Sequence, residues 1–473
     1  MGMSESDKDI KGYEGESLDR LLGRDGFSPD LPDALARRPA AKRLSLGLQL
    51  LMYMLRGLRY GELEVLLPTG ETRVFKGSER LELRGVLNIR DARIVGHVLK
   101  GGEVGFGEAY LDGCWDSPDL TSLLIVLYLN EPHLQGPYEK NVFGRLYGWI
   151  QHKRRANTKA TAKKNIEYHY DLGNEFYKLW LDETMAYSSG VFSRDESMVT
   201  PSGVFSRDES MVTPSGVFSR DESMLTPSGG LLLPNQTLKA AQLNKFRLMF
   251  ERLDLRPEHH LLEIGSGWGG FAIYAAQHSG CRVTSITLSE EQLKEARVRA
   301  EQAGVADRVN FEIRDYRDVR GQYDRIVSIE MYEAVGEEFW PAYFNAIQRA
   351  LKPGGRAAIQ GITIHPEIFD QYRTKRDFIQ KYIFPGGMLA TPERFMQAAA
   401  GAGLVSEDPR YFARDYADTL MVWHRNVLAV RDRVVEQFDE RFLRMWRYYL
   451  SYCECGFRVE RINLMQLTLN KPG

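Results

Sequence analysis

The sequence is poor in the features that mark disulfide-bonded, metal-binding and membrane-spanning proteins. Its 473 residues include four cysteines, whose spacing matches no paired metal-ligand motif. We therefore expect no bound metal and reduced thiols, as in a cytoplasmic protein. No stretch reaches the roughly 18 apolar residues that a bilayer-spanning helix needs, and the polar N-terminal residues lack the apolar core of a signal peptide. Any membrane contact is expected to be peripheral, on the inner face of the membrane.

An excess of charge of either sign is also missing. The 62 lysines and arginines nearly balance the 64 aspartates and glutamates, for a net charge of −2, which argues against a general nucleic-acid-binding protein. The basic residues that do cluster lie in residues 149–165 and at the start of residues 37–57. Residues 149–165 fit either a solvated connector or a patch attracted to anionic phospholipid headgroups. We expect an anionic membrane surface, and no nucleic acid, among the partners.

The order of these patterns predicts four parts in the chain. Residues 1–35 read as a disordered lead, residues 36–135 as a small N-terminal α+β domain, residues 136–165 as a basic linker and residues 166–473 as the main domain. Within the small domain, a Pro-Thr-Gly turn between alternating apolar and polar residues predicts a β-hairpin. The runs LELRGVLNIRD and ARIVGHVLKGG are both predicted to be strands.

A 13-residue unit, VFSRDESMVTPSG, occurs three times with almost no change in residues 191–229. The units are rich in Ser, Asp, Glu, Thr, Pro and Gly, and they carry too few apolar residues to form a core of their own. Each doubling of the length of a surface loop costs only about 0.6 kcal/mol. We therefore interpret the repeats as an insertion in a surface loop, in preference to a lid that excludes water.

From His259 onward, strand-like runs alternate with helical runs. This alternation predicts an α/β fold with a doubly wound, mostly parallel sheet. In such sheets, ligands bind at the carboxyl ends of the strands.

The segment LLEIGSGWGG joins the first of these strands to its helix. Gly265, Gly267 and Gly269 permit a tight turn and a close approach of the backbone to a ligand, and Glu263 lies two residues before the first of them. Their G-x-G-x-G spacing differs from that of a dinucleotide site. At a strand–helix junction it resembles the first motif of class I S-adenosylmethionine-dependent methyltransferases. The resemblance implies further cofactor contacts after the next two strands, at Thr287, Leu288, Ser289, Gln292, Asp315 and Tyr316.

Several longer segments resemble the cyclopropane-fatty-acyl-phospholipid synthases, over most of the chain from about residue 60. The segments that carry it include IVSIEMYEAVG and DYADTLMVWH, and the highly specific combination is YHYDLGNEFY, the glycine loop and KYIFPGG. The resemblance implies a Rossmann-like class I methyltransferase fold and a lipid- or membrane-associated small domain. It implies an enzyme that transfers the methyl carbon of S-adenosylmethionine to the double bond of an unsaturated acyl chain of a membrane phospholipid, forming a cyclopropane. A homodimer is compatible with it.

The resemblance also implies a bicarbonate ion that accepts the proton released on ring closure. The residues around this ion would be Glu333, Tyr416 and the backbone of Ile362, together with Ser189 and Gln360. The last two depart from the family pattern, which has a cysteine at the first position and a histidine at the second. A glutamine can donate a hydrogen bond to an anion but carries no positive charge. A second histidine of the family is replaced by Ala334.

The same resemblance implies the residues that close the cofactor site, which are Tyr170, Tyr187 and Ser188. Attack of an alkene on a sulfonium methyl leaves a carbocation, which requires a dry site with aromatic faces. The aromatic residues of the C-terminal half are candidates for that lining: Tyr372, Phe378, Tyr382, Phe384, Tyr416, Trp423, Trp446, Tyr448 and Tyr449.

Two other functions remain open from the sequence. Loss of the proton from a neighbouring chain carbon, instead of the new methyl group, would give a methyl-branched or methylene product without a ring. A lipid-binding protein with a catalytically decayed site is the second alternative, against which the intact glycine loop and Glu333 argue.

Overall fold

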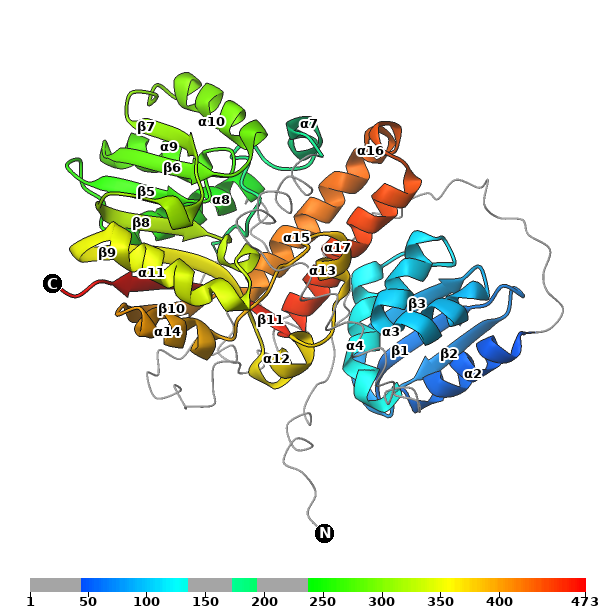
Figure 1. Cartoon of the computed structure of the whole chain (residues 1–473). Coiled ribbons are helices and arrows are strands. Elements are labelled where there is room, and N and C mark those ends of the chain that lie inside the picture. The colour runs from blue at the N-terminus through cyan, green and yellow to red at the C-terminus, as the bar shows by residue number, and fades with distance from the viewer. Residues whose placement is uncertain (1–43, 135–171, 194–236) are drawn as a thin grey trace, which may run out of the picture.

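The computed structural model describes residues 44–134, 172–193 and 237–473. The predicted lead at 1–35, the basic linker at 136–165 and nearly all of the repeats at 191–229 lie outside these ranges. The described residues form two β-sheets, one of four strands and one of seven, with helices packed on both (Figure 1). Within these residues, no helix is both long and apolar enough to cross a bilayer.

The four-stranded sheet belongs to the N-terminal part of the chain and has the strand order β2-β1-β3-β4. The predicted hairpin is confirmed, because β1 and β2 pair antiparallel across the Pro-Thr-Gly turn. Alternate residues of β1, among them Leu63 and Val65, are fully buried, since successive side chains of a strand point to opposite faces. The strands are β1 (Tyr60–Leu66), β2 (Thr72–Lys76), β3 (Glu79–Ile89) and β4 (Trp115–Asp116).

One predicted strand of this region is a helix instead. The run ARIVGHVLKGG begins α3 (Arg93–Leu111), which is kinked at Gly102, where φ is 54°. Asp91, two residues after the end of β3, accepts a hydrogen bond from the backbone N–H of Arg93 at 2.9 Å, so it supports the first turn of the helix. The two other helices that pack with this sheet are α2 (Leu46–Met54) and α4 (Leu120–Leu134).

The seven-stranded sheet has the order β10-β11-β9-β8-β5-β6-β7. The five strands from β9 to β7 are mutually parallel, and β11 and β10 are antiparallel to their neighbours. The predicted α/β fold with a mostly parallel core is thus confirmed. The strands are β5 (His260–Ile264), β6 (Arg282–Thr287), β7 (Val309–Ile313), β8 (Tyr323–Ile329), β9 (Leu351–Ile364), β10 (Val405–Tyr411) and β11 (Ile462–Asn470).

Sequence analysis did not predict β10. This strand lies at the edge of the sheet and pairs only with β11. Most of its residues are exposed, and it contains Pro409, so it has neither the apolar alternation nor the composition of a buried strand.

Both faces of the large sheet are covered, as a doubly wound fold requires. Adjacent residues of one strand enter different cores: Leu261 packs with α8–α10, whereas Leu262 packs with α11 and α14. Ala357 and Ala358 of β9 divide in the same way. The covering helices are α8 (Leu238–Leu253), α9 (Gly270–Ser279), α10 (Glu290–Gln302), α11 (Trp340–Ala350) and α14 (Pro392–Gly401).

The remaining helices fill the space between the two sheets (Figure 1). The longest is α17, which packs against α15 on one side and against α3 and α4 of the N-terminal part on the other. These connecting elements are α7 (Asn174–Lys178), α12 (Pro366–Tyr372), α13 (Phe378–Tyr382), α15 (Ala413–Ala429), α16 (Arg431–Gln437) and α17 (Glu440–Arg458).

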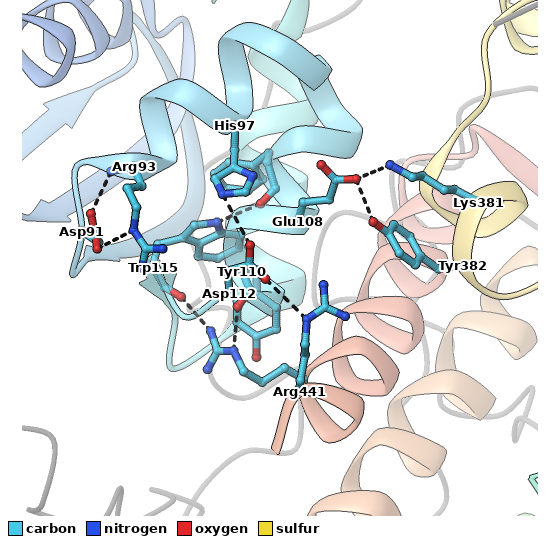
Figure 2. A network of polar contacts seen from close by, with 12 residues as sticks. Asp91, Arg93, His97, Glu108, Tyr110, Asp112, Trp115, Lys381, Tyr382 and Arg441 are labelled. Carbon is cyan, nitrogen blue, oxygen red and sulfur yellow. Dashed lines mark hydrogen bonds and ion pairs between the residues drawn. The ribbon is translucent and has the colours of Figure 1, made fainter. Parts of the chain in front are cut away.

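Polar contacts join the N-terminal part to the rest of the chain (Figure 2). Glu108 of α3 pairs with Lys381 and accepts a hydrogen bond from the Tyr382 hydroxyl at 2.7 Å. On α17, the buried Arg444 donates hydrogen bonds to the carbonyl oxygens of Tyr110 and Trp115 and to a carboxylate oxygen of Asp116, at 2.6–3.0 Å. The two parts therefore share a desolvated interface.

Candidate active site

A cavity of about 1220 Å³ lies between the two sheets. Its wall at one end is the glycine loop that follows β5, and at the other end it is formed by apolar side chains of α2, α3 and α4. A pocket for one drug-sized ligand is typically about 300–1,000 Å³. The cavity is therefore large enough for a nucleoside cofactor together with part of a long chain.

The glycine loop has the backbone geometry that sequence analysis predicted. Gly265, Gly267 and Gly269 have φ values of 95°, 48° and 82°, in the left-handed region that favours glycine. A Cβ atom on Gly267 would meet nothing within 4 Å, and this residue borders the cavity. A Cβ on Gly269 would lie 2.9 Å from the Phe311 ring. The first two glycines thus face the cavity, whereas Gly269 permits close packing of the helix on the sheet.

The residues expected after β6 form a small hydrogen-bonded group. Thr287 donates through its hydroxyl to the side-chain oxygen of Gln292 at 3.0 Å and accepts from the backbone N–H of Ser289 at 3.1 Å. Ser289 caps α10 by accepting from the Gln292 N–H. Thr287, Leu288 and Gln292 line the cavity, and Ser289 holds the turn behind them.

Only one residue of the pair expected after β7 borders the cavity. Tyr316 lines the cavity, and burial raises the pKa of its phenol to about 12. The carboxylate of Asp315 caps a short 3₁₀ turn and pairs with Arg317 at 2.6 Å. In this structure, Asp315 therefore fixes the turn that presents Tyr316.

The segment Tyr187–Ser189 forms another wall. The Tyr187 hydroxyl is 2.8 Å from that of Tyr449, and its ring lies among Tyr177, Trp180 and Trp423 at centroid distances of 5.4–5.5 Å. Tyr187 and Ser188 border the cavity. Tyr170, the third residue of the predicted set, lies outside the described residues.

A buried lysine holds this segment in place and was missed by sequence analysis. The Lys245 ammonium, which is fully buried, donates to the Ser188 hydroxyl at 2.6 Å, and burial lowers its pKa to about 8. It borders the cavity, as does Glu263, whose pKa burial raises to about 8. The signal for Lys245 in the sequence was its position on α8, where it lies at helical spacing from Ala241 and Met249 on one buried face.

Three residues expected to bind bicarbonate converge on a carboxylate of the chain itself. Glu330 accepts hydrogen bonds from the backbone N–H of Ser189 at 2.9 Å, from the side-chain amide of Gln360 at 2.7 Å and from the Tyr416 hydroxyl at 2.5 Å. Gln360 is oriented in turn by Gln466, which donates to its side-chain oxygen at 2.8 Å. Sequence analysis did not single out Glu330. Its position directly after β8, beside the strand that leads to the glycine loop, was the available signal.

Glu333 lies next to this group but has different partners. Its Oε1 atom accepts a hydrogen bond from the backbone N–H of Ile362 at 2.5 Å, and its Oε2 atom has no hydrogen-bond partner among the described residues. Burial and the nearby Glu330 raise the pKa of Glu333 to about 8. Since two neighbouring carboxylates that are partly shielded from water cannot both remain charged at low cost, Glu333 is the protonated member at neutral pH.

The aromatic residues expected to line a tunnel fall into two groups. Tyr372, Phe384, Tyr416, Tyr448 and Tyr449 border the cavity. The others lie in the surrounding structure, where Phe378, Trp423 and Trp446 are fully buried in the core and Tyr382 bonds to Glu108.

The described residues fit S-adenosylmethionine. The open backbone at Gly267, the hydroxyl and amide groups of Thr287 and Gln292, and the ring of Tyr316 lie on one wall of the cavity. Such a wall offers close backbone approach and polar groups to a nucleoside and an amino acid moiety. When bound, the cofactor would supply an electrophilic methyl group.

Comparison with known proteins agrees with this geometry. Residues 157–467 match the family model for mycolic acid cyclopropane synthetase. The chain is 35% identical over 390 residues to a tuberculostearic acid methyltransferase of Mycobacterium tuberculosis, covering 79% of this chain and 80% of the relative. It is 31% identical over 390 residues to the cyclopropane-fatty-acyl-phospholipid synthase of Escherichia coli, covering 81% of this chain and 87% of that enzyme.

A solved structure has the same fold over the main domain. The mycolic acid cyclopropane synthase CmaA1, complexed with SAH and CTAB, superposes with a TM-score of 0.54 at 26% identity. The match covers 65% of this chain and 98% of that protein.

Proposed function

The chain belongs to the mycolic acid cyclopropane synthetase family of S-adenosylmethionine-dependent methyltransferases, and from this premise we propose its substrate and product. The proposed reaction transfers the methyl carbon of S-adenosylmethionine to the double bond of an unsaturated acyl chain of a membrane phospholipid. The proposed product is a cyclopropane fatty acyl chain.

The observation that carries this proposal is the continuity of the cavity. The same space borders the glycine loop, the partly buried carboxylates Glu330 and Glu333, and leucines and valines of α2–α4. An acyl chain that enters along the apolar wall would bring a mid-chain double bond to the cofactor end. A small polar substrate would leave most of that wall in contact with water, which is unfavourable.

The aromatic groups near the carboxylates suit the charge that the reaction creates. Attack of the double bond on an electrophilic methyl leaves a cation on the acyl chain. Tyr416, Phe384 and Tyr449 line this part of the cavity, and aromatic faces attract cations most strongly where water is excluded. The rings of these residues would bind the chain and stabilise the cation.

A proton acceptor is also needed, and the family resemblance suggests bicarbonate for that role. In this chain, however, Ser189, Gln360 and Tyr416 already donate their hydrogen bonds to Glu330. A bicarbonate ion held by these groups would have to displace that carboxylate.

The apolar face of α2 supports a membrane-bound substrate. Leu46, Leu50 and Tyr53 lie at helical spacing on this helix and are 84%, 41% and 69% exposed. Leu50 and the exposed Leu99 of α3 also border the cavity. We propose that this face contacts the bilayer, so that acyl chains pass from the lipid surface into the cavity.

Product analysis tests the proposed function. The purified chain would be incubated with methyl-labelled S-adenosylmethionine and vesicles of an unsaturated phospholipid, and the fatty acids analysed by mass spectrometry before and after hydrogenation. A product heavier than the substrate by one labelled CH2 unit, which hydrogenation leaves unchanged, is expected for a ring. If the protein binds S-adenosylmethionine but forms no labelled lipid, the proposal is contradicted.

A methyl-branched or methylene product is the second candidate. It is favoured by Gln360, because the neutral amide at this position differs from the histidine of the family pattern and offers no charge to guide proton loss. Uptake of two hydrogen atoms on hydrogenation would identify an unsaturated product without a ring, either methyl-branched or methylene. A catalytically decayed lipid-binding protein would show no heat of S-adenosylmethionine binding in calorimetric titration.

A further inference from the structure

Glu330 occupies an unusual position in the chain. It follows the last residue of β8 and has a φ of 50°, in the left-handed region that an L-residue other than glycine rarely adopts. Its side chain borders the cavity and accepts hydrogen bonds at both carboxylate oxygens. Backbone strain of this kind persists only where surrounding contacts enforce it, and it is common at functional sites.

The donors around Glu330 come from three separate parts of the chain. They are the backbone after Tyr187, the middle of β9 and the first turns of α15. The arrangement is a preformed receptor for a carboxylate-shaped anion, and Glu330 fills it. The positive charge of Lys245 acts on this carboxylate, and the neighbouring acid that interacts with it is Glu333.

We propose that Glu330 is the general base of the reaction and that its carboxylate takes the place of a bound bicarbonate, so that catalysis by this chain needs no added anion. This inference rests on the proposed methyl transfer to an acyl double bond and adds the identity of the proton acceptor to it. Glu330 is a catalytic residue in this assignment because it accepts the proton directly from the substrate.

The step conserves atoms and electrons. The π electrons of the double bond form a bond to the methyl carbon as the carbon–sulfur bond breaks, and sulfur keeps that pair. A C–H bond of the resulting cation then breaks, and its proton goes to a carboxylate oxygen of Glu330. The electron pair of this C–H bond closes the ring if the proton comes from the new methyl group, and forms a double bond if it comes from an adjacent chain carbon.

The charges nearby favour Glu330 over Glu333 as the base. Burial raises the pKa of Glu330, while hydrogen bonds from Tyr416, Ser189 and Gln360 and the charge of Lys245 act in the opposite direction. Glu333 is repelled by Glu330, and only backbone N–H groups, those of Ile362 and of Glu333 itself, act to lower its pKa. Hydrogen bonds to the charged form stabilise it, so the ionised carboxylate of the pair is Glu330.

Two substitutions at this position separate the role of the base from that of the fold. Glu330→Gln fills the same space without a basic oxygen anion, whereas Glu330→Gly empties the receptor and suits the positive φ. Both variants are expected to lose about 10²–10⁴-fold in kcat in carbonate-free buffer, with S-adenosylmethionine binding by calorimetry retained. Glu338→Gln, the same change at an exposed residue eight positions along the chain, is the matched control and is expected to keep the parental rate.

Rescue with small anions gives a result that a purely structural role would not produce. Bicarbonate or formate added to Glu330→Gly is expected to restore a concentration-dependent part of the rate, because either ion fits the vacated donors. Glu330→Gln is expected to show no rescue, and the parent enzyme no dependence on bicarbonate.

Three results would overturn the proposal. They are parental rates for Glu330→Gly in carbonate-free buffer, a parent enzyme that requires bicarbonate, and loss of activity in Glu330→Gly that no anion restores although the protein melts cooperatively and binds cofactor. A parent enzyme that binds cofactor yet forms no methylated lipid would instead contradict the proposed function itself.

Discussion

At the scale of single residues, the cavity is lined by ionisable groups whose pKa values are shifted. Burial raises the pKa values of Glu263 and Glu333 to about 8 and lowers that of Lys245 to about 8. Perturbed pKa values of this kind cluster at functional sites, because the desolvation that shifts them also strengthens electrostatic effects on a substrate. Lys245, Glu263 and Glu333 thus have similar pKa values of about 8.

The raised pKa of Glu333 predicts an unusual dependence of stability on pH. Between its ordinary value of 4.5 and about 8, the folded protein keeps a proton that the unfolded chain releases, so the free energy of unfolding falls as pH rises through this range. Glu333→Gln removes this titration. Urea unfolding of parent and variant at pH 5 and pH 8 should show a smaller decline for the variant, and equal declines would contradict the assignment.

The backbone at Gly267 makes a prediction about cofactor binding. Gly267→Val places a branched side chain at φ 48°, in space that the cofactor is proposed to approach. We expect calorimetry to show a loss of S-adenosylmethionine affinity of at least tenfold. Gly304→Val, at a surface turn with φ 69° where a Cβ also meets nothing within 4 Å, carries similar backbone strain far from the cavity and is the control. Unchanged affinity in Gly267→Val would place the cofactor elsewhere.

At the scale of elements, helix α2 combines a buried face with an exposed apolar one. Leu48 and Met52 enter the core, while Leu46, Leu50 and Tyr53 are exposed beside the cavity. An isolated helix of nine residues is marginal in water, so packing on the inner face fixes it. The outer face stays exposed, which is what the proposed contact with a lipid surface requires.

Substitution on that face should weaken membrane binding without unfolding the protein. Fully burying a leucine side chain contributes about 1.5–3 kcal/mol, so Leu46→Ser combined with Tyr53→Ser should lower the affinity for phospholipid vesicles at least tenfold in co-sedimentation. Val298→Ser, at an exposed apolar residue on α10, is the control. Vesicle binding that is unaffected by the double substitution would remove α2 from the membrane contact.

At the scale of the whole molecule, the cavity exists because two parts of the chain are held together. Its walls come from both sheets and their helices, and the contact between them is made largely by α17. Arg444 on this helix donates to three groups of the N-terminal part and lies over the ring of Tyr110 at 3.9 Å. Loss of this contact would open the cavity as well as weaken the fold.

Arg444→Gln tests the cost of breaking the interface. Removing one member of a buried ion pair costs about 3–5 kcal/mol, because its partner is left uncompensated. We expect a loss of this size in urea unfolding, reduced in part by the second cation, Arg90, that lies 3.3 Å from Asp116. Arg441→Gln, three residues earlier on the same helix and paired with Asp112 at an exposed site, should cost less than about 1 kcal/mol. Equal effects of the two substitutions would contradict this account.

The sequence by itself determined the features that depend on local chemistry. Strand–helix alternation after His259 specified the doubly wound sheet, and the glycine spacing at 265–269 specified a loop with positive φ. These signals are readable because periodicity and glycine act on neighbouring residues. Local signals were insufficient at Arg93–Leu111. The apolar and small residues there are compatible with a strand or a helix, and tertiary packing stabilises the helix. The reading of residues 191–229 as an insertion stays a prediction.

Only the tertiary structure decided what the predicted anion-binding residues hold. Glu330 meets Ser189, Gln360 and Tyr416 across separations of 141, 30 and 86 residues. No local pattern encodes such a meeting, because it depends on the order of strands in the sheet and on the placement of α15 beside it. Lys245 likewise became part of the site only when α8 packed its inner face against the segment that carries Ser188. Side chains that are far apart in sequence form hydrogen bonds and shift each other's pKa values once folding brings them together and removes the water between them.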